Sequence, residues 1–262
     1  MSLLSYNRST MLSSCSPALE WSLKFVAVAT GQQNYDQKCR NGLYRWFIRC
    51  YERLICPGII EHYLNRKQYI EQQTRRMLTE GMYQRVVNLA GSFDTLALRL
   101  ASQYPDIEFI EVDHPATQRV KQHVVGNHQR ANVKFVPIDY TTHALVNVLE
   151  TNNSTGTLFI AEGLLMYLSE QEVRTLFQSL KQLSPHHRSL IFTYLPDETR
   201  SETLLTRLWL ALKQENLRWA PGAEELQHLT MSTFSCIDAN EPVTFDSAGN
   251  FLLREMACIV SA

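Results

Sequence analysis

The chain has 262 residues, of which 45% are hydrophobic and 19% are charged. This length and apolar content predict one large α/β domain with a helical extension rather than two independent domains. The 25 basic and 26 acidic residues leave a net charge of −1. That balance argues against a broad nucleic-acid-binding surface and against an anionic membrane as partner.

The six cysteines are spread along the chain without a C-x-x-C pair or histidines at metal-ligand spacing. We therefore expect no metal site and no disulfide framework, and we interpret the thiols as reduced ones in a cytoplasmic protein. No apolar run approaches the ~18 residues of a membrane span. The N-terminus also lacks a basic start followed by a continuous apolar stretch, so we predict a soluble, intracellular protein.

The first part of the chain has helical patterns but no strand pattern. A break at Pro57-Gly58 precedes a polar-rich helix that we expect from about Ile60 to Leu78. We interpret residues 1–80 as a helical N-terminal cap and residues 81–262 as the core domain.

Five strand-like runs follow, with helix-like segments between most of them. This alternation predicts parallel strands joined by crossover helices. The runs are Arg85–Ala90, Ile107–Val112, Val133–Ile138, Thr157–Ala161 and Ser189–Leu195.

The clearest helix lies between the fourth and fifth runs. Ser169 and Glu172 form a capping box there, and Pro185 closes the helix. A second helix is expected from about Ser201 to Leu217. Two last runs, at 233–237 and 251–260, are joined by a polar loop and should pair antiparallel. The whole pattern predicts a doubly wound α/β sheet of seven strands.

Three small residues, Ala90-Gly91-Ser92, separate the first strand-like run from a helix-like segment. Such a turn brings backbone N–H groups and a helix N-terminus close to a nucleotide ligand, although an ordinary strand-to-helix turn looks the same. Asp113 ends the second run, roughly 20 residues after Gly91, where doubly wound sheets place the acid that binds ribose hydroxyls. A second reading is that Asp113 caps the helix that begins near Pro115, and both roles can hold at once.

Four sequence blocks between roughly Pro57 and Pro196 resemble the leucine carboxyl methyltransferase family of S-adenosylmethionine-dependent enzymes. The family's turn V-V-x-L-G-A-G-L-D-T is matched by V-V-N-L-A-G-S-F-D-T at 86–95, and its E-V-D-x-P by E-V-D-H-P at 111–115. The E-G-L-L-M-Y-L block at 162–168 is the most specific, and P-G followed by R-K and I-E at 57–71 is the fourth. The resemblance implies a Rossmann-like methyltransferase sheet, since a terminal antiparallel pair is typical of methyltransferases rather than dehydrogenases.

The resemblance also implies roles for individual residues. Arg66 matches the arginine that pairs with the methionine carboxylate of the cofactor, a pairing that suits a guanidinium fork. Asp113 matches the ribose-binding acid, and Glu162 the acid beside the amino end of the cofactor. Tyr167 is expected near the transferred methyl group or the acceptor, and either Arg66 or Tyr167 would hold an acceptor carboxylate.

The remaining cofactor contacts implied by the family are at strand ends. Asp139 matches the acid that accepts from the adenine amino group, with Tyr140 beside it as a backbone donor or ring contact. The other contacts expected are Ala90, Gly91, Ser92 and His114. The family's Gly-Ala-Gly becomes Ala90-Gly91-Ser92 here, and the methyl and hydroxymethyl groups added at its two glycine positions predict weakened or repositioned cofactor binding.

The implied activity is methyl transfer from S-adenosylmethionine to a carboxylate or hydroxyl group of a small-molecule acceptor. A carboxylate is already ionised near pH 7 and needs no general base, whereas a phenol or alcohol does. His62, His114 and His186-His187 are weak candidates for that base, and Tyr194 either lines the acceptor pocket or is a core residue.

Three other functions are open at this point. The chain is alternatively a protein C-terminal carboxyl methyltransferase, or a catalytically silent cofactor-binding scaffold. A nicotinamide-dependent oxidoreductase is also considered, but the terminal strand pair and the 162–168 block argue against it. The acceptor and the oligomeric state are not predicted.

Overall fold

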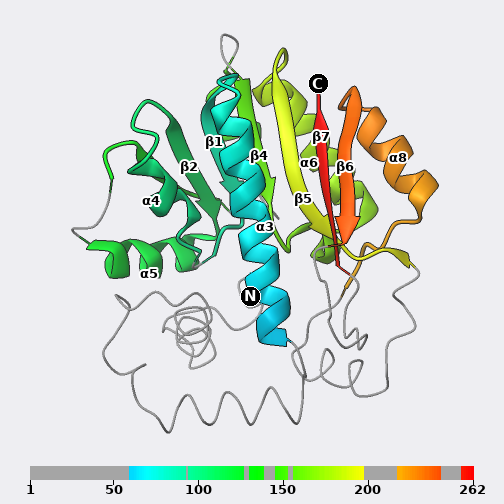
Figure 1. Ribbon diagram of the computed structural model, residues 1–262, viewed down its shortest axis with the longest axis horizontal. Helices are drawn as coiled ribbons and strands as arrows, with labels where there is room; N and C mark the ends of the chain where they lie inside the picture. Colours follow the sequence, from blue (N-terminus) through cyan, green and yellow to red (C-terminus); the bar gives the residue numbers. More distant parts are fainter. Residues whose placement is uncertain are drawn as a thin grey trace, which may run out of the picture.

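The computed structural model describes residues 59–92, 94–126, 130–138, 145–152, 156–197, 217–242 and 255–262. Within these ranges, seven strands form a single sheet in the order β3-β2-β1-β4-β5-β7-β6 (Figure 1). The strands are β1 (Tyr83–Leu89), β2 (Glu108–Asp113), β3 (Val133–Pro137), β4 (Gly156–Ala161), β5 (Arg188–Tyr194), β6 (Cys236–Pro242) and β7 (Met256–Ser261).

The first five strands are parallel, and β7 pairs antiparallel with both β5 and β6. This confirms the predicted doubly wound sheet with its terminal antiparallel pair. Because β7 runs in the opposite direction, Met256 at its start pairs with Tyr194 at the end of β5. The residue before β7 therefore lies at the edge where the parallel strands end. Doubly wound sheets bind their ligands at this edge.

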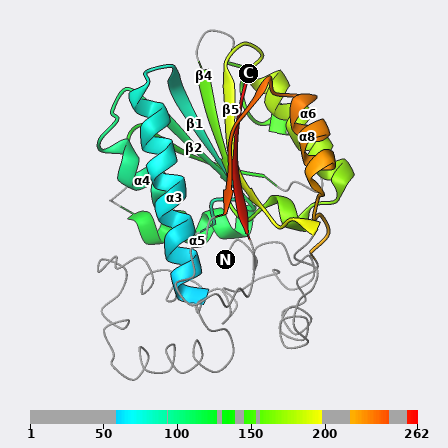
Figure 2. The same cartoon turned by 45° about the vertical axis from the view of Figure 1, so that its right-hand side comes forward.

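Helices cover both faces of the sheet (Figures 1 and 2). Apolar side chains of α3 (Ile59–Thr79) and α4 (Leu96–Ala101) pack on one face, and those of α6 (Glu170–Leu183) and α8 (Ala223–Met231) pack on the other. The other described helices are α5 (Pro115–Val125) and the short 3₁₀ turns η4 (Leu145–Asn147) and η5 (Leu165–Tyr167).

The predicted helix start at Ser169 is confirmed as a full capping box. The Ser169 Oγ accepts from the Glu172 backbone N–H at 3.3 Å, and a Glu172 carboxylate oxygen accepts from the Ser169 N–H at 2.7 Å. The buried stripe of α6 includes Val173, Phe177 and Leu180, as the periodicity predicts.

The sequence reading was least accurate near the chain's end. The pattern at 233–237 predicts a strand, but β6 begins only at Cys236, because the N–H groups of Thr233 and Phe234 still bond back to Thr230 after α8. Helix α8 itself was not predicted, although Leu226 and Leu229 are buried in the core. The predicted 201–217 helix lies almost entirely outside the described residues, as does the first part of the 251–260 strand.

The predicted helix at 60–78 is confirmed as α3. Its residues Ile70, Met77 and Leu78 belong to the apolar cluster on one face of the sheet. This part of the predicted cap therefore packs directly on the core domain. The rest of the cap, residues 1–58, lies outside the described residues, and the division into cap and core stays a prediction.

Candidate functional site

The turn after β1 adopts an unusual backbone conformation. Ala90 and Ser92 both have positive φ angles, 52° and 46°, a region that costs non-glycine residues roughly 1–2 kcal/mol. These are the two positions at which the family pattern has glycine. Gly91 has a different requirement, because a Cβ on it would lie 2.5 Å from the Asn88 side-chain nitrogen.

The turn is tied to the end of β2 through Asp113. The backbone N–H of Ser92 donates to one Asp113 carboxylate oxygen at 2.5 Å, and the N–H of His114 donates to the other at 2.6 Å. Burial raises the pKa of Asp113, and these two backbone hydrogen bonds oppose that shift. Each carboxylate oxygen has a second lone pair, so the acid retains the capacity to accept from ribose hydroxyls.

His114, and not Asp113, is the N-cap residue of α5. Its Nδ1 accepts from the Ala116 N–H at 3.2 Å, so the alternative reading of Asp113 as the helix cap is wrong. A direct contact between His114 and the cofactor stays a prediction. Glu111, two residues before Asp113 on β2, is buried and pairs with Lys121 of α5.

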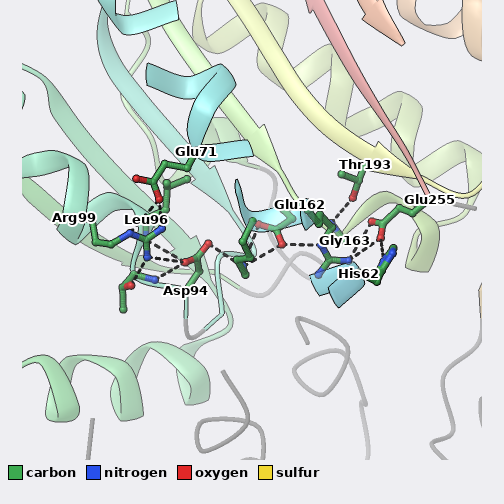
Figure 3. A network of polar contacts seen from close by, with 12 residues as sticks. His62, Glu71, Asp94, Leu96, Arg99, Glu162, Gly163, Thr193 and Glu255 are labelled. Atoms are coloured by element: carbon green, nitrogen blue, oxygen red, sulfur yellow. Dashed lines mark hydrogen bonds and ion pairs between the residues drawn. The ribbon is translucent and has the colours of Figure 1, made fainter. Parts of the chain in front are cut away.

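A buried cluster of charged side chains lies at the same sheet edge (Figure 3). Arg66 of α3 donates from Nε to Glu162 at 2.8 Å and from Nη1 to both Glu255 oxygens at 2.9 and 3.1 Å. His62, one turn earlier on α3, lies with its Nε2 2.7 Å from the same Glu255. The structure thus brings together Arg66 and Glu162, two of the residues predicted for one end of the cofactor.

The neighbouring Lys67 extends this cluster toward the turn. Its Nζ lies 2.9 Å from Asp94 and 3.0 Å from Glu162. The other Asp94 oxygen accepts from the N–H groups of Thr95 and Leu96 at 2.6 and 3.2 Å, at the start of α4. Figure 3 shows Glu162 between Asp94 on one side and Glu255 on the other.

The charges in this cluster stabilise one another. Burial alone would raise the pKa of Glu255 and of Asp94, but the cations beside them, Arg66 for Glu255 and Lys67 for Asp94, hold both pKa values well below their usual range. Conversely, burial would lower the pKa of Lys67, but Asp94 and Glu162 raise it. All three groups are therefore charged at neutral pH, and the site holds fixed positive and negative charge side by side.

The segment after β4 carries another predicted site residue, Tyr167. Gly163 has a φ of 60° and donates its N–H to the Thr193 hydroxyl at 2.8 Å. Tyr167 lies in η5 and packs, 7% exposed, with Met166 and Leu195. Its role beside the methyl group or acceptor stays a prediction.

Tyr194 has the core role that was considered as an alternative. Its hydroxyl donates to the Asn240 side chain at 3.0 Å, and its ring contacts Phe192 and Trp219. Asp139 and Tyr140 lie outside the described residues, so the adenine contacts are predictions.

Four residues of the site were not predicted from the sequence: Lys67, Asp94, Thr193 and Glu255. Lys67 and Asp94 stand inside the quoted family blocks, so proximity to Arg66 and to the turn was a usable signal for them. Glu255 had no such signal, because only the pairing of β7 with β5 brings it to the cluster.

Among the described helices, none has the length and apolar character needed to cross a membrane. Within the described ranges of the chain, no group of three or more His, Cys, Asp or Glu side chains is arranged to hold a metal ion.

The sequence relatives match about half of the chain. Residues 31–181 match the leucine carboxyl methyltransferase family. YktD of Bacillus subtilis, provisionally named an S-adenosyl-L-methionine-dependent methyltransferase, is 30% identical over 141 residues, which are 52% of this chain and 46% of that protein. The O-methyltransferase CTB2 of Cercospora beticola is 29% identical over 116 residues, 44% of this chain and 25% of that protein. The matches thus span less than half the length of either relative.

Two solved structures of low sequence identity share this fold. A protein of Thermobifida fusca, provisionally named a methyltransferase, aligns with a TM-score of 0.60 at 18% identity, covering 93% of this chain and 97% of that one. An O-methyltransferase family protein of Burkholderia thailandensis aligns with a TM-score of 0.52 at 12% identity, covering 93% and 69%. Because the family match extends over more than half of the chain, the chain belongs to the leucine carboxyl methyltransferase family.

Proposed function

We propose that this protein transfers a methyl group from S-adenosylmethionine to a carboxylate or hydroxyl oxygen of a small-molecule acceptor. The observation that carries the proposal is the pairing of Arg66 and Lys67 with Glu162 at the sheet edge that also holds Asp113. The names of CTB2 and of the Burkholderia thailandensis protein, both O-methyltransferases, support the choice of oxygen as acceptor atom.

The residues present fit the cofactor group by group. Its amino-acid end is a zwitterion, and the cluster offers both complementary charges: Arg66 and Lys67 for the carboxylate, and Glu162 for the ammonium group. Asp113, at the adjacent strand end, offers its carboxylate to the ribose hydroxyls. Because both signs of charge are already fixed in place, little reorganisation accompanies binding.

The bound cofactor supplies an electrophilic methyl group on a positively charged sulfur. The protein's task is to align the acceptor oxygen with that group and to exclude water, and such alignment contributes about 7 to 11 kcal/mol in favourable cases. A carboxylate acceptor needs no base at neutral pH. Tyr167 is the residue we propose beside the acceptor.

The proposal is tested by calorimetric titration with S-adenosylmethionine and with its product S-adenosylhomocysteine. We expect micromolar binding by the wild type and at least a tenfold loss in Arg66→Ala, because a charge-assisted hydrogen bond contributes ~1.5–3 kcal/mol. Arg76→Ala on the same helix is the matched control: Arg76 is exposed on α3, and its loss should leave binding unchanged.

The titration also separates the competing functions. Absence of binding to the wild type would contradict the proposal and favour the catalytically silent scaffold. Where binding is found, the acceptor class is tested by methyl transfer from radiolabelled cofactor to small carboxylic acids, to hydroxylated metabolites and to peptides with a free C-terminal carboxylate. Labelling of peptides alone would favour the protein carboxyl methyltransferase.

A further inference from the structure

Glu255 reaches the site from the far end of the chain. It directly precedes β7, whose first residue Met256 pairs with Tyr194 at the end of β5. It therefore lies at the edge where the parallel strands end, and it is only 1% exposed. Glu255 stands well beyond residue 181, where the family match ends.

Glu255 contacts both Arg66 and His62 of α3. Both of its carboxylate oxygens accept from Arg66 Nη1, at 2.9 and 3.1 Å, and His62 lies 2.7 Å away (Figure 3). The Nε of Arg66 is taken by a different acid, Glu162. A planar guanidinium that is bound by two acids at two of its nitrogens has its plane and its direction fixed.

We infer that Glu255 is a positioning residue: it orients the Arg66 guanidinium, and through it sets the affinity for the carboxylate at the amino-acid end of the cofactor. The inference rests on the proposed function. Without Glu255, Arg66 retains its hydrogen bond to Glu162 but loses the second acid, and one acid alone does not fix the plane of the guanidinium. Arg66 then pairs more fully with Glu162, which withdraws both groups from the zwitterionic ligand.

The test compares two ligands that differ at the amino-acid end. S-adenosylhomocysteine carries the carboxylate and the ammonium group, whereas 5′-methylthioadenosine lacks both. In Glu255→Gln we expect about tenfold weaker binding of S-adenosylhomocysteine, with unchanged binding of 5′-methylthioadenosine. Glu170→Gln is the matched control, because Glu170 pairs with Arg174 on the exposed side of α6, and it should change neither affinity.

Three results of this titration would overturn the inference. Equal weakening of both ligands would indicate a general structural role. No change would show that Arg66 is oriented without Glu255. Tighter binding of S-adenosylhomocysteine would show that Glu255 competes with the ligand for Arg66 instead of positioning it.

A second readout requires no ligand and keeps the two proposals separate. We expect the NMR signals of the Arg66 guanidinium to show restricted rotation in the wild type and faster rotation in Glu255→Gln, with Glu255→Asp as the substitute variant if the glutamine does not fold. Unchanged rotation would overturn the inference. Absence of ligand binding by a wild type with a restricted Arg66 would instead contradict only the proposed function.

Discussion

In the turn after β1, two residues depart from the family pattern at a cost in backbone strain. Ala90 and Ser92 occupy left-handed backbone conformations in which a Cβ is unfavourable and glycine is not. The sequence comparison alone predicted crowding near the ligand at these positions. The structure adds backbone strain as a second consequence of the same substitutions.

Replacing Ala90 by glycine should therefore stabilise the protein. We expect Ala90→Gly to raise the free energy of unfolding by about 1 kcal/mol, because relief of the strain exceeds the added entropy of the unfolded chain. Urea denaturation measures the change. The control is Ala97→Gly inside α4, which should lower stability by a similar amount; a loss of stability in both variants would contradict the strain argument.

The pairing of Asp94 with Lys67 should make stability depend on pH. The pKa of Asp94 is lowered in the folded protein from its ordinary 3.8, so its contribution is fully present above that value and is lost as the pH falls below it. We expect Asp94→Asn to lower the free energy of unfolding by about 3 kcal/mol at pH 7. This difference in free energy of unfolding between the wild type and the variant should become smaller below pH ~4.

Denaturation curves recorded from pH 7 down to pH 2 measure the difference in free energy of unfolding between the wild type and Asp94→Asn. The exposed Asp106 provides the control, since Asp106→Asn should leave stability almost unchanged throughout. A gap between wild type and Asp94→Asn that stays constant over the acid range would show that the lost stability is unrelated to the charge on Asp94.

At the scale of single elements, α6 is the helix whose local sequence and tertiary packing agree most closely. The capping box at Ser169 and Glu172 determines where the helix begins, and its apolar stripe packs against the sheet. Glu172 also accepts from Arg218 at 2.8 Å, so the helix start is joined to the segment that follows the last parallel strand.

Loss of the Ser169 cap should weaken α6 by a predictable amount. We expect Ser169→Ala to lower the free energy of unfolding by about 1 kcal/mol, because one helix N–H loses its acceptor. Thermal or urea denaturation measures it. Ser102→Ala serves as the control: this exposed serine follows α4 and donates to the Arg99 carbonyl, and its removal should cost less than ~0.5 kcal/mol. Equal losses in both variants would contradict a specific role of the cap.

The ends of helices and strands were predicted closely where the segment has a clear apolar pattern. Strands β2 and β4 are buried along most or all of their length and were predicted to within a residue or two. The region of α8 and β6 was misread, because β6 alternates between exposed and partly buried positions and contributes little apolar pattern.

At the scale of the whole molecule, the site is assembled from segments that are far apart in the chain. Arg66 and Lys67 come from α3, before the first strand, Glu162 follows β4, and Glu255 precedes β7. Parallel strands bring their ends to one edge, and the antiparallel β7 brings its beginning to that edge as well. The reversed direction of one strand therefore decides which residue faces Arg66.

The seven-stranded α/β sheet with its terminal antiparallel pair, the small-residue turn after β1 and the family membership were predicted from the sequence alone, since periodicity, small residues and contiguous motifs are local properties of the chain. The partners of Arg66 and the distinct roles of Gly91 and its neighbours were decided only by the tertiary structure. Those features depend on distances between segments separated by many residues, and on backbone angles that residue identity does not specify. Glu255 is the clearest case, because no local pattern marks a lone glutamate as a buried partner of an arginine almost two hundred residues away.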